Sequence, residues 1–122
     1  MTTLPLIYLA QPITKPCPML NAHQGMRAFD ELLDTGLCIP ICPAWSCFQQ
    51  MYAPRTYEEW LAYDFEIIRR CDAMLRLPGE SEGADRETEF ARENGIPVFA
   101  DMAALLDWCE ARVRAARLAA AV

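Results

Sequence analysis

Short apolar runs alternate along the chain with longer segments in which apolar residues recur every three or four positions. A run of about five apolar residues is typical of a buried β-strand, and the longer recurrence is typical of an amphipathic helix. The runs that predict strands are residues 6–10, 37–42, 73–77 and 96–100. The segments that predict helices are residues 21–35, 56–70, 84–93 and 102–118. Residues 43–55 follow neither pattern, so we expect a long aromatic-rich loop there.

Polar residues and a glycine predict where these helices begin and stop. Asn21 and Thr56 each precede a Gln or Glu by three residues, which is the spacing of a capping box. Asp101 is a third candidate N-cap, and Gly36 stands where a left-handed C-cap residue is favoured. In the first helix, the apolar stripe that we expect to face the core consists of Ala22, Met26, Phe29 and Leu33.

Strands that alternate with helices predict an α/β fold with a parallel sheet. We expect three layers, flavodoxin-like or Rossmann-like, with four to five strands and helices on both faces. Pro40 inside the second run is typical of an edge strand. The 122 residues form one domain, residues 1–122. Ligands of such sheets bind beyond the C-terminal ends of the strands, so we expect a site built from loops 10–20, 43–55 and 78–84.

Two acidic residues interrupt the apolar faces of the predicted helices. Asp64 lies four residues from both Trp60 and Ile68, and Glu87 shares a face with Ala84. An unpaired buried carboxylate is costly, so each needs donors or a ligand. The structural alternatives are an Asp satisfied by amides or an Arg, and a first-turn Glu that complements the helix dipole. The functional alternative is a ligand contact at Asp64, and a nucleophile or general base at Glu87.

The loop from Gly79 to Gly83 precedes the helix that carries Glu87. Backbone amides and the hydroxyl of Ser81 at a helix N-terminus can bind a small anion. The loop has neither the Walker A pattern nor the GxGxxG pattern, so it does not identify a nucleotide-binding class by itself.

Composition narrows the classes of partner and cofactor. Seventeen acidic residues against eleven Lys and Arg give a net charge of −6, which argues against a polymeric nucleic acid as partner. No apolar run is long enough for a membrane helix, and the N-terminus is not a signal peptide, so we expect a cytoplasmic protein without a membrane partner. We expect the six cysteines to be reduced. With one histidine and no zinc-site spacing, we expect no metal and no other cofactor.

Three motifs resemble the nucleoside 2-deoxyribosyltransferase-like superfamily. The segment IYLAQPIT at residues 7–14 is similar to the start YLAGPxT of that family. Residues 81–91 are similar to its signature S-x-G-x-x-x-E-x-x-x-A. Asp64 precedes residues 71–73 at the spacing of the family's ligand-binding Asp before its third strand. The motifs occur in the family's order and cover about residues 6 to 100. The chain most resembles small bacterial and phage domains of this superfamily without an assigned function.

The resemblance implies an enzyme that cleaves the N-glycosidic bond of a nucleoside. Glu87 matches the family nucleophile, which attacks the anomeric carbon and forms a glycosyl ester. Tyr8 matches the Tyr whose hydroxyl positions that nucleophile, and Asp64 matches the Asp that contacts the nucleoside and helps to protonate the leaving base. Retaining glycosidases use a carboxylate and an acid in the same way. Family members share sites between subunits, so we expect a homodimer or homotetramer.

Position 81 separates subfamilies of this superfamily. Transferases that act on free nucleosides carry an acid there, whereas the 5′-monophosphate N-hydrolases carry a Ser that binds phosphate. The chain has Ser81, with Thr14 and Lys15 on the first loop. Ser in place of an acid also removes a charge that would repel phosphate. We therefore expect an N-glycosidase of a (deoxy)nucleoside 5′-monophosphate. The alternatives are a base-exchanging deoxyribosyltransferase and a nucleotide-binding or sensor domain without turnover.

The first loop departs from the family at one position. Gln11 replaces the family's Gly, so a side chain is expected to fill part of the pocket or to contact the base. Trp45 is a candidate for stacking on a base, although aromatic residues more often pack than bind. The residues expected to contact the substrate are Gln11, Pro12, Thr14, Lys15, Trp45, Ser81 and Gly83.

Overall fold

Four short strands form one parallel sheet in the computed structural model, which describes residues 3–121. They are β1 (Leu6–Ala10), β2 (Ile39–Ile41), β3 (Ala73–Arg76) and β4 (Val98–Phe99). The strand order is β2-β1-β3-β4, and all three pairings are parallel. β1 therefore lies inside the sheet, where Tyr8 pairs with Ile41 on one side and Met74 on the other. Pro40 lies in an edge strand, which confirms the prediction for that run.

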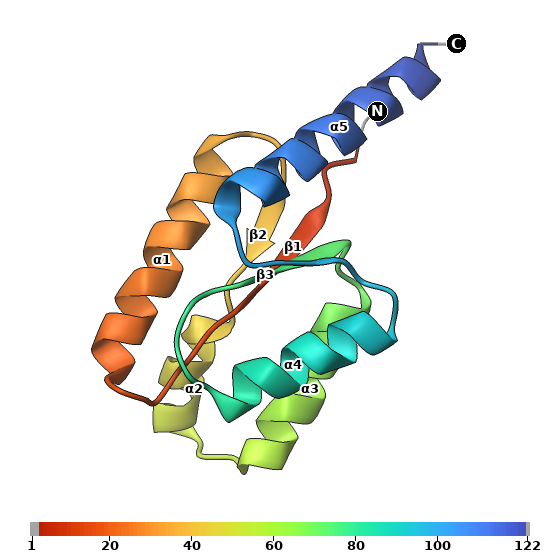
Figure 1. The fold of residues 1–122 in the computed structure, drawn as a ribbon. Coiled ribbons are helices and arrows are strands. Elements are labelled where there is room, and N and C mark those ends of the chain that lie inside the picture. Colours follow the sequence, from red (N-terminus) through yellow and green to blue (C-terminus); the bar gives the residue numbers. More distant parts are fainter. Residues whose placement is uncertain (1–2, 122) are drawn as a thin grey trace.

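Helices cover both faces of the sheet, so the predicted three-layer α/β architecture is confirmed (Figure 1). The helices are α1 (Pro18–Asp34), the 3₁₀-helix η1 (Pro43–Trp45), α2 (Ser46–Tyr52), α3 (Tyr57–Arg69), α4 (Glu82–Glu93) and α5 (Met102–Ala120). α1 and α5 lie on one side of the strands, and α3 and α4 lie on the other. Within residues 3–121, no helix has the length and apolar character needed to cross a membrane.

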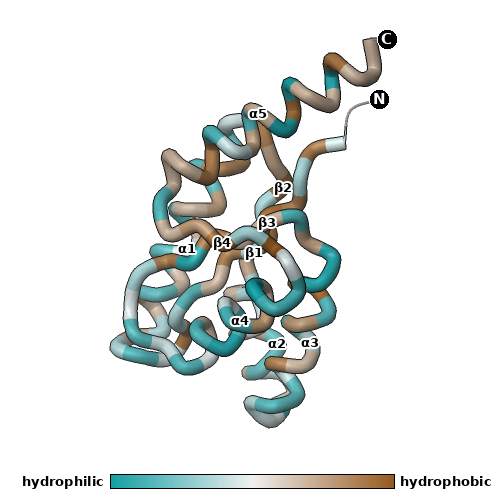
Figure 2. The backbone as a smooth tube through the Cα atoms, turned by 45° about the vertical axis from the view of Figure 1, so that its right-hand side comes forward, coloured by the Kyte–Doolittle hydropathy of each residue, from teal (hydrophilic) through white to brown (hydrophobic). Residues whose placement is uncertain are grey.

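Alternating side chains of β1 divide the hydrophobic core into two clusters. Ile7 and Leu9 pack in the layer of α1 and α5, together with Leu32 and Leu105. The second cluster lies under α3 and α4, and contains Tyr8, Ala10, Ile68, Met74, Ala84 and Ala91. Hydrophobic colours run through the strands and much of α5, and hydrophilic colours are concentrated in α4 and in loops around the sheet (Figure 2). This alternation directs the ring of Tyr8 toward the two helices that carry Asp64 and Glu87.

The start of α1 differs from the prediction. The helix begins at Pro18 with Cys17 as its N-cap, so Asn21 lies inside the helix and does not cap it. The buried face is also shifted by one residue from the predicted apolar stripe, and consists of Asn21, Gly25, Ala28 and Leu32. The polar Asn21 and the small Gly25 lie on the core side because they contact the loop after β1, as described below. Met26 and Leu33 of the predicted stripe are about half exposed.

The prediction of a loop over residues 43–55 is wrong, because η1 and α2 occupy residues 43–52. α2 buries none of its residues. A helix without a buried face needs no apolar stripe, and its sequence therefore lacks the periodic signal that marks the other helices.

The remaining caps agree with the sequence. Thr56 accepts a hydrogen bond from the amide of Glu59 at the start of α3, and Asp101 accepts one from the amide of Ala104 at the start of α5. Gly36 has a φ of +68° directly after the C-cap of α1, as predicted. α4 begins two residues earlier than predicted, at Glu82, because Ser81 is its N-cap.

Candidate active site

Tyr8, Asp64 and Glu87 come together between the sheet and the α3–α4 layer. The hydroxyl of Tyr8 donates a hydrogen bond of 2.5 Å to Oε2 of Glu87, and both side chains are buried. Asp64 is half-buried and interacts with both partners. These three residues, which we call the triad, come from β1, α3 and α4, so the fold joins positions that are up to 79 residues apart in the chain. This is the grouping that the sequence predicts for the catalytic residues.

Small side chains bring α4 close enough for Glu87 to reach Tyr8. Ala84 and Ala91 lie one turn before and after Glu87 on the buried face of α4, and they pack in the same core cluster as Tyr8. The sequence suggested that Glu87 lies in the first turn of the helix. Because α4 starts at Glu82, Glu87 lies in the second turn. The helix dipole acts mainly within the first turn, so it contributes less to the charge on Glu87 than expected.

The environment of the triad favours protonated carboxyl groups. Burial is the main cause that raises the pKa of Glu87 well above its usual 4.5, and the charge of Asp64 raises it further. Burial also raises the pKa of Asp64 above its usual 3.8, and polar interactions with Glu87 and then Tyr8 lower it in part. The pKa of Tyr8 is raised by burial and then by both carboxylates, so its hydroxyl keeps the proton that it donates to Glu87.

Two neighbouring carboxyl groups with raised pKa values hold one proton between them over a broad range of pH. The pKa is raised more at Glu87 than at Asp64, so the shared proton favours Glu87 in the resting pair. When that proton passes to Asp64, Asp64 becomes a neutral acid and Glu87 an anion that accepts the hydrogen bond of Tyr8. A buried pair of this kind combines a nucleophile with an acid, which is the requirement for cleaving a glycosidic bond with retention.

Arg76 holds the loop that leads into α4. It is the last residue of β3, and its guanidinium donates to the carbonyl of Leu77, to that of Gly79 at 2.9 Å and to Asp85 at 3.0 Å. These bonds hold the loop between β3 and α4. The positive charge of Arg76 also lowers the pKa of Glu87 and so favours the anion.

A hollow of about 550 Å³ lies at the N-terminus of α4, and Ser81 lines it. The Ser81 hydroxyl oxygen accepts the amide hydrogen of Ala84 at 3.0 Å, which leaves its own proton free to donate. A side chain at Gly83 would begin 3.5 Å from the hydroxyl of Tyr57. The charged residues around the hollow are Arg76, Arg86, Glu80, Glu82, Asp85 and Glu89, so carboxylates outnumber guanidinium groups. No triad residue lines this hollow.

The side chain of Gln11 is directed at α1. Its amide nitrogen donates to the carbonyl of Asn21 at 2.7 Å, and its amide oxygen lies 3.1 Å from the thiol of Cys42. Asn21 in turn donates to the carbonyls of Ile13 and Lys15. Both polar atoms of Gln11 are thus engaged inside the protein, where they fix the loop that follows β1. Sequence reasoning missed Asn21 in this role, because a buried Asn near a helix start has the same spacing as a cap.

The other predicted residues of the first loop differ in exposure. Pro12 is fully buried, and its Cγ lies 2.8 Å from the position that a side chain at Gly79 would occupy. Gly79 also has a φ of +119°. Glycine is therefore favoured at this position both by the lack of space beside Pro12 and by the backbone conformation. Thr14 and Lys15 are exposed, and the bonds from Asn21 hold the backbone on either side of Thr14.

The contact between Gln11 and α1 gives a testable prediction. A Cβ at position 25 would lie 2.1 Å from Oε1 of Gln11, so Gly25→Ala displaces the Gln11 amide from its hydrogen bonds. We expect Gly25→Ala to lower the free energy of unfolding by about 1–3 kcal/mol. The measurement is urea denaturation of four proteins: wild type, each single variant and the double variant with Gln11→Gly. The loss should shrink to a few tenths of a kcal/mol in the Gln11→Gly background. An equal loss in both backgrounds would contradict the interpretation.

Trp45 lies apart from the triad, in a group of three aromatic rings. Its ring centroid is 6.4 Å from that of Trp60 and 6.1 Å from that of Tyr63, and these two are 5.9 Å from each other. The three rings line a second hollow of about 370 Å³, together with Gln49, Arg55 and Glu59. Trp60 and Tyr63 lie four residues and one residue before Asp64 in α3, and both line this outer hollow.

The described residues contain no group of three or more His, Cys, Asp or Glu side chains that could hold a metal ion. The triad consists of the Tyr8 hydroxyl and two carboxyl groups. The substrate residues predicted from the sequence divide among the first loop, the start of α4 and the aromatic hollow.

Comparison with known proteins places the chain in a family. A family model described as a domain of unknown function, DUF4406, matches residues 5–100, a range that includes all three triad residues. No curated protein and no solved structure matches the chain significantly. Because the family match covers more than half of the 122 residues, the chain belongs to the DUF4406 family.

Proposed function

We propose that the protein is an N-glycosidase that hydrolyses the bond between base and sugar of a (deoxy)nucleoside 5′-monophosphate, with Glu87 as nucleophile. The observation that carries this proposal is the 2.5 Å hydrogen bond from Tyr8 to a buried Glu87, whose pKa is raised further by the charge of the neighbouring Asp64. A surface carboxylate would need no such partners. A buried one with a fixed orientation and a nearby acid is suited to attack on an electrophilic carbon.

The proposed reaction proceeds in two steps through a glycosyl ester. In the first step an oxygen of ionised Glu87 bonds to the anomeric carbon while the bond to the base nitrogen breaks, and the proton of Asp64 passes to the departing base. In the second step Asp64 takes a proton from water, whose oxygen attacks the anomeric carbon and releases Glu87. The hydrogen bond from Tyr8 orients the attacking carboxylate, and Asp64 alternates between acid and base.

The phosphate specificity is supported by Ser81, whose hydroxyl proton remains free at the N-terminus of α4, and by the exposed Thr14 and Lys15. The carboxylates that surround Ser81 oppose a second or third phosphate more than a single one. We therefore expect monophosphates to be hydrolysed faster than diphosphates or triphosphates of the same nucleoside.

The direct test incubates the protein with each ribonucleoside and deoxyribonucleoside 5′-monophosphate and with the matching free nucleosides. Chromatography then measures free base and sugar phosphate. Release of base from monophosphates in preference to nucleosides supports the proposal. Adding a second free base separates the alternatives, because a new nucleoside or nucleotide identifies a transferase. A ligand that raises Tm while no product forms identifies a binding domain.

Tyr8→Phe tests the role of the hydroxyl. The Tyr8 hydrogen bond lowers the pKa of Glu87, so its loss raises that pKa further and leaves less of the nucleophile ionised. We expect kcat/KM to fall by about 10- to 100-fold near neutral pH. The acid limb of the pH profile should also move to higher pH. A variant with reduced rate but an unmoved acid limb would contradict this role.

A further inference from the structure

The rings of Trp45, Trp60 and Tyr63 line the aromatic hollow and meet one another edge to face. The interplanar angles are 88°, 76° and 88°, so each ring is close to perpendicular to the other two. Trp45 and Tyr63 remain about half exposed, at 47% and 45%. Three large aromatic side chains gathered at the surface around an open volume are typical of a recognition site.

Perpendicular rings select the shape of a ligand. A flat base is sandwiched by parallel faces, whereas three perpendicular faces surround a compact, nearly spherical group. A cation that lies about 4.5 Å above two perpendicular ring faces separates their centroids by about 6.4 Å. The observed separations of 5.9–6.4 Å are close to this value. Aromatic cages of this kind recognise quaternary ammonium groups.

The charge at the rim also favours a cation. Glu59 lines the hollow, and its carboxylate oxygen lies 3.3 Å from Nη1 of Arg55. Both of these side chains are more than half exposed, so this ion pair is weak and exchangeable. A ligand cation can therefore replace the Arg55 guanidinium beside Glu59. The net charge of −6 raises the local concentration of cations around the whole molecule.

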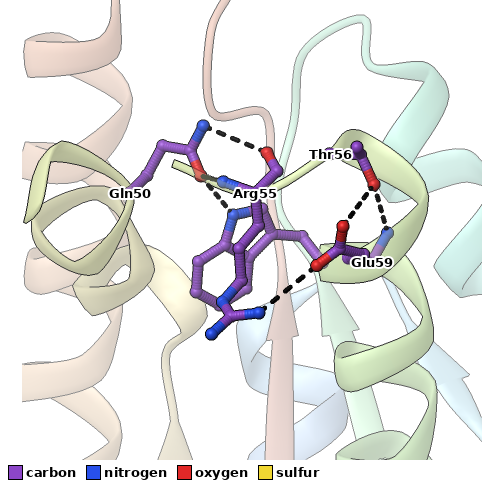
Figure 3. Close-up of polar contacts among 5 residues, drawn as sticks. Gln50, Arg55, Thr56 and Glu59 are labelled. Carbon is purple, nitrogen blue, oxygen red and sulfur yellow. Dashed lines mark hydrogen bonds and ion pairs between the residues drawn. The ribbon is translucent and has the colours of Figure 1, made fainter. Parts of the chain in front are cut away.

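Hydrogen bonds hold part of the hollow in place before any ligand binds. The side-chain oxygen of Gln50 accepts from the indole of Trp60 at 2.5 Å and from the backbone amide of Arg55 at 2.9 Å. Its amide nitrogen donates to the carbonyl of Arg55, and Thr56 binds Glu59 at the start of α3 (Figure 3). Because the Trp60 ring and the Glu59 carboxylate are already oriented, binding a ligand costs less conformational entropy.

We propose that this hollow binds a quaternary ammonium group, carried either by a small molecule such as choline or by a trimethylated lysine side chain. The site is separate from the triad, because none of Tyr8, Asp64 and Glu87 lines it. It is therefore independent of the proposed hydrolysis, and neither result decides the other.

Fluorescence titration of the full chain tests the site. The chain has three tryptophans, and Trp108 packs against Phe99 on the other side of the sheet, so Trp108→Phe leaves the two cage indoles as the tryptophan reporters. The probes are choline, an acetylated trimethyllysine amide and 3,3-dimethylbutan-1-ol, which is the neutral isostere of choline. We expect at least one ammonium probe to change the fluorescence saturably and the neutral isostere to bind at least about tenfold more weakly. Comparison of the two ammonium probes identifies the carrier.

Variants inside and outside the hollow test whether the ammonium probes bind there. Glu59→Gln and Tyr63→Ala should each weaken binding by about 3- to 30-fold, whereas Tyr52→Ala, which removes a ring that is 86% exposed and outside the cage, should leave it unchanged. Arg55→Gln should bind at least as tightly as wild type, because it frees Glu59. Four results would each overturn the proposal. They are equal affinity for the neutral isostere, no binding of either ammonium probe up to about 50 mM, tighter binding of adenosine 5′-monophosphate at the same tryptophans, and weaker binding of the ammonium probes to Arg55→Gln.

Discussion

Glu87→Gln should reduce the release of base from the best substrate by at least about a thousandfold, because it removes the attacking oxygen anion. The substitution keeps the size of the side chain and an oxygen that can accept the hydrogen bond from Tyr8. Substrate binding, measured as a shift in Tm with added nucleotide, should therefore change little. The measurement is single-turnover base release by chromatography in wild type and variant.

A matched control removes a carboxylate without touching the triad. Glu93 is the last residue of α4, is exposed and lies outside the Ser81 hollow, so Glu93→Gln should retain the wild-type rate within a factor of about two. A Glu87→Gln protein that released base as fast as the Glu93→Gln control would refute the assignment of the nucleophile. A protein in which neither wild type nor variant released base, but both bound nucleotide, would favour the binding-domain alternative.

The triad could be predicted from the sequence because its acids break a regular pattern. Asp64 lies on the apolar stripe of α3, and Glu87 lies on that of α4, so each had to be directed inward wherever the helix packed. Tyr8 lies in an apolar run that becomes an inner strand, and only the resemblance to the nucleoside 2-deoxyribosyltransferase-like superfamily implied its place beside Glu87. Tyr8, Asp64 and Glu87 come together because alternate side chains of β1 point to opposite faces of the sheet and because α3 and α4 cover the face toward which Tyr8 points.

What the sequence did not predict depends on residues whose role is tertiary. α2 has no buried residue, so it leaves no periodic signal. The core face of α1 is shifted by one residue because Asn21 and Gly25 contact the loop after β1, although Met26 and Leu33 fit an apolar stripe better. The bonds of Gln11 and Arg76 also join segments that are distant in sequence. Local patterns carry no information about such partners.

The second large effect concerns stability, where Glu87→Gln should be more stable than wild type at neutral and alkaline pH. Burial and the charge of Asp64 raise the pKa of Glu87 in the folded protein well above its usual 4.5, which is close to its value in the unfolded chain. Folding therefore favours the protonated form. For a group with a raised pKa, the stabilising contribution is complete below the unfolded pKa and is lost as the pH rises through the folded pKa.

The wild type should thus lose up to about 1.4 kcal/mol of stability per pH unit in the interval between these two pKa values, while Gln at position 87 cannot ionise and loses none from this source. Near pH 4 the two proteins should unfold at similar temperatures, since protonated Glu and Gln have the same shape. By pH 8 the Tm of Glu87→Gln should exceed that of wild type by several degrees, at about 4 °C per kcal/mol. Thermal unfolding from pH 4 to 8 measures the difference, with Glu93→Gln, an exposed position at the end of the same helix, as the control. A Tm difference that stayed constant or reversed with rising pH would contradict the raised pKa of Glu87, because it would mean that Glu87 ionises in the folded protein at little cost.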